Sequence, residues 1–296
     1  MPTLRDVRKR IAGIKKTQKI TRAMKMVAAA KLRRAQVAVV SARPYARKIL
    51  ELLQHLAPGV EQGGGNLFAS RPLAHVALVV VTADRGMCGA FNTNIIRAAE
   101  RHIATTYGEI PGRDRVVLFC VGRKGADFFA KRSCAIAGRY PNIFNNLEFS
   151  QAKAVVREIR DGYLRGSFDR VDVIYNEFKS VAQQRIVIEQ FLPIPPGTGT
   201  PSGKTGAITD YIYEPSEEAI TEALIPKHLD FQLWRVLLES NASEQGARMA
   251  AMENATENAE ELISSLQLQY NKARQAAITK ELLEIVSGAE ALARAE

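Results

Sequence analysis

The sequence predicts an α/β chain in which the two terminal segments form a long antiparallel two-helix coiled coil around a central α/β domain. Three observations predict this organisation. Both ends carry apolar residues at spacings of three and four, and the middle alternates short β-rich runs with helical stretches. The ends also have opposite charge, with fifteen Lys and Arg against one acid in residues 1–48 and seven bases against fourteen acids in residues 216–296.

The first expected element is a helix over residues 1–57. Between Leu4 and Arg43 the only helix breaker is Gly13, and Pro58 followed by Gly59 should end the helix. A helix of this length would measure about 80 Å.

An apolar stripe runs along this helix. It consists of Leu4, Val7, Ile11, Ile14, Ala28, Leu32, Ala35 and Val39. The polar residues Gln18, Thr21 and Lys25 interrupt the stripe, and Ile20, Met24 and Val27 offer a shifted one. We therefore expect a heptad seam with a local slip.

Residues 58–74 contain a glycine run and Pro72 and are expected to be a linker. A central domain over residues 75–215 follows. Strands are expected at 75–81, 115–121, 135–138, 171–178, 185–191 and 207–213, and helices at 92–107, 126–132 and 150–164. Because the first strand is continuously apolar and helices separate the strands, we expect a mostly parallel, Rossmann-like sheet whose last strands are antiparallel.

The last element is a helix within residues 216–296. Between Leu229 and Ser287 there is no proline and only Gly246. Its expected seam comprises Met252, Ala255, Ala259, Leu262, Leu266, Ala273, Ala276 and Leu283, with Gln269 and Lys280 as exceptions. Since the α/β domain joins both helices at the same end, they should pair antiparallel. An alanine-rich seam buries little area, so the rod should need a sheath.

The sequence predicts no catalytic, cofactor-binding or metal-binding residue. Gly199 stands one residue too close to Gly203-Lys204 for a P-loop, which favours a hairpin loop over a nucleotide site. Cys88, Cys120 and Cys134 form no ligand cluster with the four scattered histidines and are interpreted as small core residues of a protein from a reducing compartment. Asp84-Arg85-Gly86, directly after the first strand, is interpreted as a structural turn.

Two further patterns concern the surroundings of the protein. The longest apolar run, Leu73 to Val81, is far shorter than the roughly 20 residues of a membrane span, and the N-terminus does not resemble a secretory signal. The basic N-terminal helix could follow a phosphate backbone, but contact with protein partners is favoured because no aromatic residue precedes Tyr45 and the tail is acidic. We therefore expect neither nucleic-acid binding nor direct membrane insertion.

Several blocks of sequence resemble the gamma subunit of rotary (F-type) ATP synthases. They are TRAMKMVAAAKLRRAQ at 21–36, ARPYA at 42–46, TADRGMCGAFNTN at 82–94, DYIYEPS at 210–216, SEQGARMAAMENATENA at 243–259 and LQLQYNKARQAAITKELLEIVSGAEAL at 266–292. They lie in the family's order over nearly the whole chain. The match begins by Leu4, so no transit peptide is expected, which points to a bacterial protein.

The resemblance implies a non-catalytic rotor subunit. In this family the terminal helices form a shaft inside a ring of three alpha and three beta subunits, and the α/β domain forms a foot that meets the epsilon subunit and the membrane c-ring. The expected location is peripheral, at the cytoplasmic face of the bacterial inner membrane. No cofactor is expected, because the family's nucleotide sites lie on beta.

The resemblance also implies contact residues for the beta subunit. Matched position by position, they are Met24, Lys25, Arg248, Arg274, Gln275, Thr279 and Glu281. Two other classes stay open as alternatives: a basic coiled-coil protein that binds nucleic acid, and an enzyme with a nucleotide-binding α/β domain. Salt-sensitive DNA binding by the isolated chain would favour the first alternative, and ATP binding without partners would favour the second.

Overall fold

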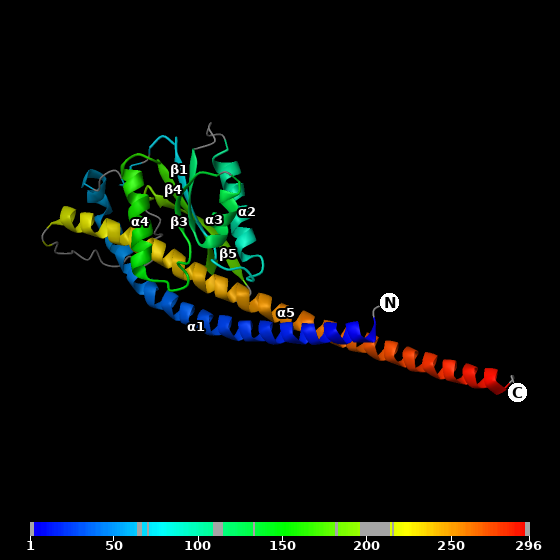
Figure 1. Ribbon diagram of the computed structural model, residues 1–296. Coiled ribbons are helices and arrows are strands. Elements are labelled where there is room, and N and C mark those ends of the chain that lie inside the picture. The colour runs from blue at the N-terminus through cyan, green and yellow to red at the C-terminus, as the bar shows by residue number, and fades with distance from the viewer. Residues whose placement is uncertain are drawn as a thin grey trace. The chain divides into compact units, whose positions relative to one another are not determined.

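The computed structural model describes residues 3–63, 67–69, 71–108, 115–132, 134–180, 183–195, 214 and 216–293 (Figure 1). The helices are α1 (Leu4–Gly63), α2 (Phe91–Thr106), α3 (Arg123–Ala130), α4 (Phe149–Leu164) and α5 (Glu217–Ala293). The strands are β1 (Val76–Val81), β2 (Val116–Val121), β3 (Ile136–Tyr140), β4 (Arg170–Phe178) and β5 (Gln184–Leu192). The fold class predicted from the sequence is therefore confirmed.

The chain divides into two units, which we call the coiled-coil unit and the α/β unit. The coiled-coil unit comprises residues 1–27 and 249–296, and the α/β unit comprises residues 28–248. Helices α1 and α5 therefore each have one part in the coiled-coil unit and one part in the α/β unit.

The α/β unit is built on one five-stranded sheet in the order β3-β2-β1-β4-β5. The first four strands pair parallel, and β5 pairs antiparallel with β4, as the sequence predicts for the last strands. The strand expected at 207–213 and the glycine-rich loop at 197–205 lie outside the described residues.

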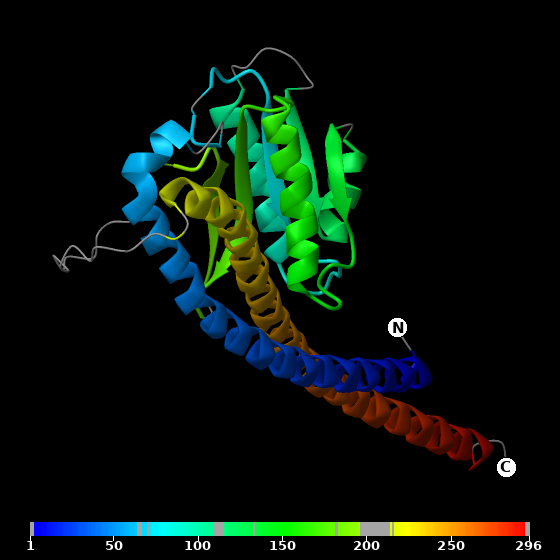
Figure 2. The same ribbon diagram turned by 90° about the vertical axis from the view of Figure 1, so that its left-hand side faces the viewer.

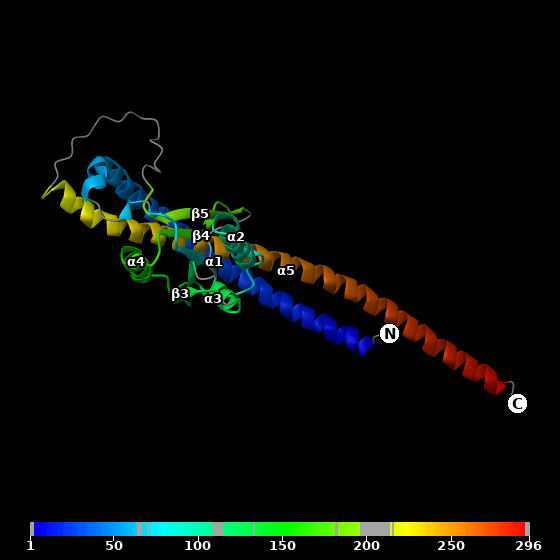
Figure 3. The ribbon, with the colours of Figure 1, turned by 90° about the horizontal axis from the view of Figure 1, so that it is seen from above.

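Helices cover both faces of this sheet. On one face α4 and the Ile225–Leu237 stretch of α5 pack on Val79, Val173 and Tyr175. On the other face α2 and α3 pack on residues such as Leu78, Val80 and Ile174. Seen from above, α2 and α4 accordingly lie on opposite sides of the sheet (Figure 3). Every residue of β1 is buried, as expected for the central strand of a covered parallel sheet.

Helix α1 extends beyond its expected end. It continues past Pro58 and Gly59 to Gly63, so residues 58–63 are helical where the sequence favours a linker. A proline removes one backbone hydrogen bond and kinks the helix, but a long helix can continue beyond the kink. Cys88 and Cys120 are buried in the core, as predicted, whereas Cys134 is only half-buried.

Candidate partner-contact site

In the coiled-coil unit, α1 and α5 run side by side in opposite directions (Figure 2). The two helices are joined by a hydrogen bond between Thr21 Oγ1 and Thr256 Oγ1 of 2.8 Å and by an ion pair between Lys25 and Glu253. Extending the alignment residue by residue from the Thr21–Thr256 pair brings Leu4 level with Ala273. The antiparallel pairing predicted from the sequence is therefore confirmed.

The expected slip in the α1 stripe is wrong. The inward-facing residues follow one unbroken alternation of threes and fours, namely Leu4, Val7, Ile11, Ile14, Gln18, Thr21 and Lys25, which continues in the α/β unit with Ala28, Leu32, Ala35 and Val39. Ile20 and Val27 of the shifted stripe are exposed, and Met24 is half-buried. Thr21 and Lys25 stay in the seam because α5 supplies partners for them, Thr256 and Glu253.

The seam of α5 agrees with the expected one at Met252, Ala259, Leu266 and Ala273 and differs from it elsewhere. Its inward-facing residues opposite α1 are Met252, Thr256, Ala259, Ile263, Leu266, Tyr270 and Ala273. Leu262, Ala276 and Leu283, which we expected in the seam, are exposed. Ile263 takes the place of Leu262, one residue further along the helix.

The two threonine hydroxyl groups in the seam also lie within hydrogen-bonding distance of backbone carbonyl oxygens of their own helices. The Thr21 hydroxyl lies 3.0 Å from the carbonyl oxygen of Gln18, and the Thr256 hydroxyl lies 2.7 Å from that of Met252. The ammonium group of Lys25 is paired with Glu253. Because the Lys25 side chain is 37% exposed, a partner protein can still reach it. Of the predicted contact residues, Met24 and Lys25 are thus placed at the half-exposed rim of a polar seam.

The C-terminal part of α5 has no stretch of α1 beside it in this register. We call residues 274–293 the single-helix extension. Exposed large apolar residues gather there: Ile278, Leu282, Leu283, Ile285 and Val286. The predicted contact residues Arg274, Gln275, Thr279 and Glu281 lie on the same segment and are exposed as well. A concentration of exposed apolar side chains of this kind is typical of a surface that another protein covers.

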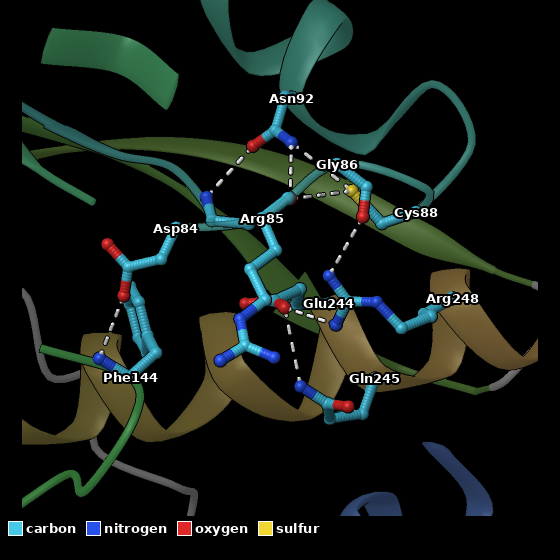
Figure 4. A network of polar contacts seen from close by, with 10 residues as sticks. Asp84, Arg85, Gly86, Cys88, Asn92, Phe144, Glu244, Gln245 and Arg248 are labelled. Atoms are coloured by element: carbon cyan, nitrogen blue, oxygen red, sulfur yellow. Dashed lines mark hydrogen bonds and ion pairs between the residues drawn. The ribbon is translucent and has the colours of Figure 1, made fainter. Parts of the chain in front are cut away.

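Arg248 lies in the α/β unit in a different setting. Its side chain is only 12% exposed. One guanidinium nitrogen pairs with Glu244, and Nη2 donates to the carbonyl oxygen of Gly86 at 3.2 Å (Figure 4). Contact between Arg248 and a beta subunit stays a prediction, and the guanidinium group already has partners within its own chain.

The turn after β1 is held together by its own side chains. Both Asp84 carboxylate oxygens accept backbone hydrogen bonds, Oδ1 from Arg123 and Asn142 and Oδ2 from Phe144. Asn92 accepts from the backbone of Ala83 at 2.8 Å (Figure 4). Asp84 therefore ties three loops together, which agrees with the structural interpretation of this turn.

A second polar cluster was not apparent from the sequence. His102 on α2 lies 2.8 Å from the buried carboxylate of Asp172 on β4, which also accepts from Tyr107 and from Arg170. Burial raises the pKa of Asp172, but the hydrogen bonds from His102 and Tyr107 and the charge of Arg170 leave it below its usual value. The cluster fastens the end of α2 to the sheet. Seventy residues separate His102 from Asp172, so no local pattern could reveal the pair.

Within the described residues, no group of three His, Cys, Asp or Glu side chains is placed to hold a metal ion. Nor does any helix in that part of the chain combine the length and the apolar character needed to cross a membrane.

Comparison with known proteins gives a consistent result. The sequence pattern of a family described as ATP synthase matches residues 3–292. The ATP synthase gamma chains of Chloroherpeton thalassium and Chlorobium phaeobacteroides are 53% and 54% identical, and each alignment covers 99% of both chains.

Solved structures agree in fold. A chain of the Euglena gracilis mitochondrial ATP synthase, solved with OSCP, F1 and the c-ring, has a TM-score of 0.71 at 24% identity over 98% of this chain and 94% of its own. A chain of the Tetrahymena thermophila mitochondrial ATP synthase central stalk and c-ring has a TM-score of 0.57 at 25% identity, over 80% of this chain and 99% of its own. With near-complete coverage at more than half identity, the chain belongs to the ATP synthase gamma chain family.

Proposed function

We propose that this chain is the central-stalk rotor subunit of an F-type ATP synthase, with its coiled-coil unit turning inside a ring of three alpha and three beta subunits. The observation that carries the proposal is the single-helix extension. It presents five large apolar side chains that nothing in the described residues covers. A closed ring of partner subunits would remove these side chains from water without adding a second helix.

The proposed contacts with beta fall in two places on the coiled-coil unit. Met24 and Lys25 would form the first, at the rim of the polar seam, where Lys25 can exchange Glu253 for a carboxylate of the ring. Arg274, Gln275, Thr279 and Glu281 would form the second, on the extension. Exposed ion pairs are worth about 0–1 kcal/mol, so such contacts can be broken and remade in every turn.

The mechanism follows from symmetry. One asymmetric shaft cannot present the same face to three beta subunits, so each catalytic site would be held in a different conformation. Rotation would move every site through the same series, because contact with the shaft biases an equilibrium that each beta subunit already has. The chain itself would catalyse nothing and would transmit torque between the ring and the membrane c-ring.

The remaining partners are proposed on the family relationship. The α/β unit would be the foot that meets the epsilon subunit and the c-ring, at the cytoplasmic face of a bacterial inner membrane. The chain would be held there through its partners, as a peripheral subunit.

Cross-linking in the assembled complex tests the proposal. A cysteine at Met24 or Lys25, oxidised to a cysteine on the facing beta loop, should stop sustained ATP turnover, and reduction should restore it. A control pair that joins this chain to epsilon, which would turn with it, should leave hydrolysis largely intact. The rotor assignment fails if the bond to beta forms completely while coupled proton pumping and ATP hydrolysis continue at the uncrosslinked rate.

A further inference from the structure

The carboxyl ends of the parallel strands in an open α/β sheet form the crevice in which such folds usually bind ligands. In the α/β unit this edge carries the turn of residues 84–90, directly after β1. Helix α5 lies against that turn. Arg248 reaches the carbonyl oxygen of Gly86 (Figure 4). Ala247 packs in the same core cluster as Ala83 and Cys88.

The stretch of α5 that lies there is polar and nevertheless buried. Its buried polar residues are Glu239, Ser240, Ser243, Glu244 and Gln245. Burial of polar groups is costly unless they are hydrogen-bonded, so a helix that needed only to cover a core would carry apolar residues instead. Asp84, directly after β1, is itself buried and lies close enough to Glu244 for the two charges to interact. Polar residues of this edge of the sheet thus meet a polar segment of the same chain.

We propose that residues 239–248 of α5 occupy this crevice as an internal ligand, and that Glu244 and Arg248 are the positioning residues that hold the turn of residues 84–90 to the helix. The inference concerns the folded chain alone and does not depend on the rotor proposal.

The geometry suits this role. The Arg248 guanidinium group divides its donors between the Glu244 carboxylate, one helical turn away, and the backbone of the turn 162 residues away in sequence. Arginine is suited to such a double contact because its donors are fixed in a planar fork. Glu244 is almost fully buried, and burial raises its pKa while the charge of Arg248 counteracts the rise. Glu244 and Arg248 therefore each offset part of the free-energy cost of burying the other's charge.

The native cysteines report on this contact without added labels. Cys88 lies in the turn and is 1% exposed, whereas Cys120 lies in β2 and is 0% exposed. Local opening of the turn exposes Cys88 alone. Global unfolding exposes both thiols together.

The test measures maleimide labelling of each thiol in the full-length chain, resolved by peptide mass spectrometry. Arg248→Met should raise the labelling rate of Cys88 at least tenfold and leave that of Cys120 unchanged. Arg157→Met is the matched control, because Arg157 and Asp161 form an exposed pair at the same helical spacing, and it should leave both rates within twofold. A Cys88 rate within twofold of the parent, or a parallel rise at Cys120, overturns the proposal.

Two more variants guard against a chain that merely fails to fold. The pair Glu244→Leu with Arg248→Met leaves no buried charge unpaired, and it should still accelerate Cys88 over Cys120. Arg248→Lys keeps the charge but lacks the fork, so its Cys88 rate should fall between those of the parent and of Arg248→Met. Labelling of Arg248→Lys as slow as the parent would overturn the role given to the Gly86 contact, and a parallel rise of both thiols in the double variant would overturn the whole inference.

Discussion

Leu266 and Leu268 of α5 offer a matched test of the seam in the coiled-coil unit. Leu266 lies in the seam and is 4% exposed, whereas Leu268, two residues further on, is 57% exposed. Replacing either residue with alanine removes the same atoms from the same helix and changes helix propensity equally. The difference between the two variants therefore reports burial alone.

The expected magnitudes follow from these exposures. Full burial of a leucine side chain is worth about 1.5–3 kcal/mol, and an unfilled cavity adds to the loss on truncation. Because a single partner helix covers Leu266, we expect Leu266→Ala to cost about 2–3 kcal/mol, in the lower part of the range for core leucines. Leu268 is about half as well buried and its removal leaves no cavity, so Leu268→Ala should cost about 1 kcal/mol or less.

Millisecond-resolved amide exchange on the full-length chain measures these losses locally. Since about 1.4 kcal/mol corresponds to a factor of ten, exchange across residues 256–273 should accelerate roughly 30- to 150-fold in Leu266→Ala and at most about fivefold in Leu268→Ala. Exchange in β1 serves as the internal reference and should not change. Equal acceleration in the two variants, or a larger effect at Leu268, would refute the seam register.

Two more predictions concern the α/β unit. Gly122 and Gly166 both have positive φ, but only at Gly122 would an added Cβ clash, 2.0 Å from the carbonyl oxygen of Thr82. Urea unfolding should therefore show a loss of at least about 3 kcal/mol for Gly122→Ala and about 1 kcal/mol for Gly166→Ala, and similar losses would contradict the clash. Burial, followed by the charge of Arg235, lowers the pKa of His228 to about 4. Because the unfolded chain binds this proton near pH 6.5, the stability that neutral His228 supplies is complete above that pH and is lost as the pH falls to 4, by about 1–3 kcal/mol. His228→Gln should reduce the pH dependence of the unfolding free energy by that amount, and an unchanged profile would contradict the shift.

The elements of the sheet could be predicted from the sequence because each leaves a local trace. The continuous apolar run of β1 and the helical periodicity of α2 and α4 are set by neighbours within a few residues. Contacts between distant residues leave no such trace. The pairing of Arg248 with Gly86 and of His102 with Asp172 depends on how the topology brings separate elements together.

The error in the seam has a more specific cause. On α5 the expected and observed stripes share Met252, Ala259, Leu266 and Ala273, so apolar spacing alone hardly separates them. On α1 the residues that interrupt the apolar stripe are polar, which favours a slip when the helix is considered alone. The partner helix determines which residues of α1 face inward, because Thr21 is hydrogen-bonded to Thr256 and Lys25 is paired with Glu253. A polar residue belongs in a seam when the facing helix can satisfy it, and a single helix cannot show that.

The polar seam also bears on how the coiled-coil unit is stabilised. The α/β unit covers its sheet with helices on both faces and buries large side chains such as Phe119, Tyr163 and Tyr175 completely. The coiled-coil unit has one seam, in which alanine, threonine and an exposed ion pair replace much of the leucine and isoleucine of a self-sufficient coiled coil. A hydroxyl pair of this kind contributes about 1 kcal/mol, less than a buried leucine. The apolar surface that could compensate lies outward, on Ile20, Val27 and the single-helix extension. The seam therefore supplies only a modest part of the free energy that could hold these two helices together, and the ring proposed above would add to it by covering the outward apolar residues.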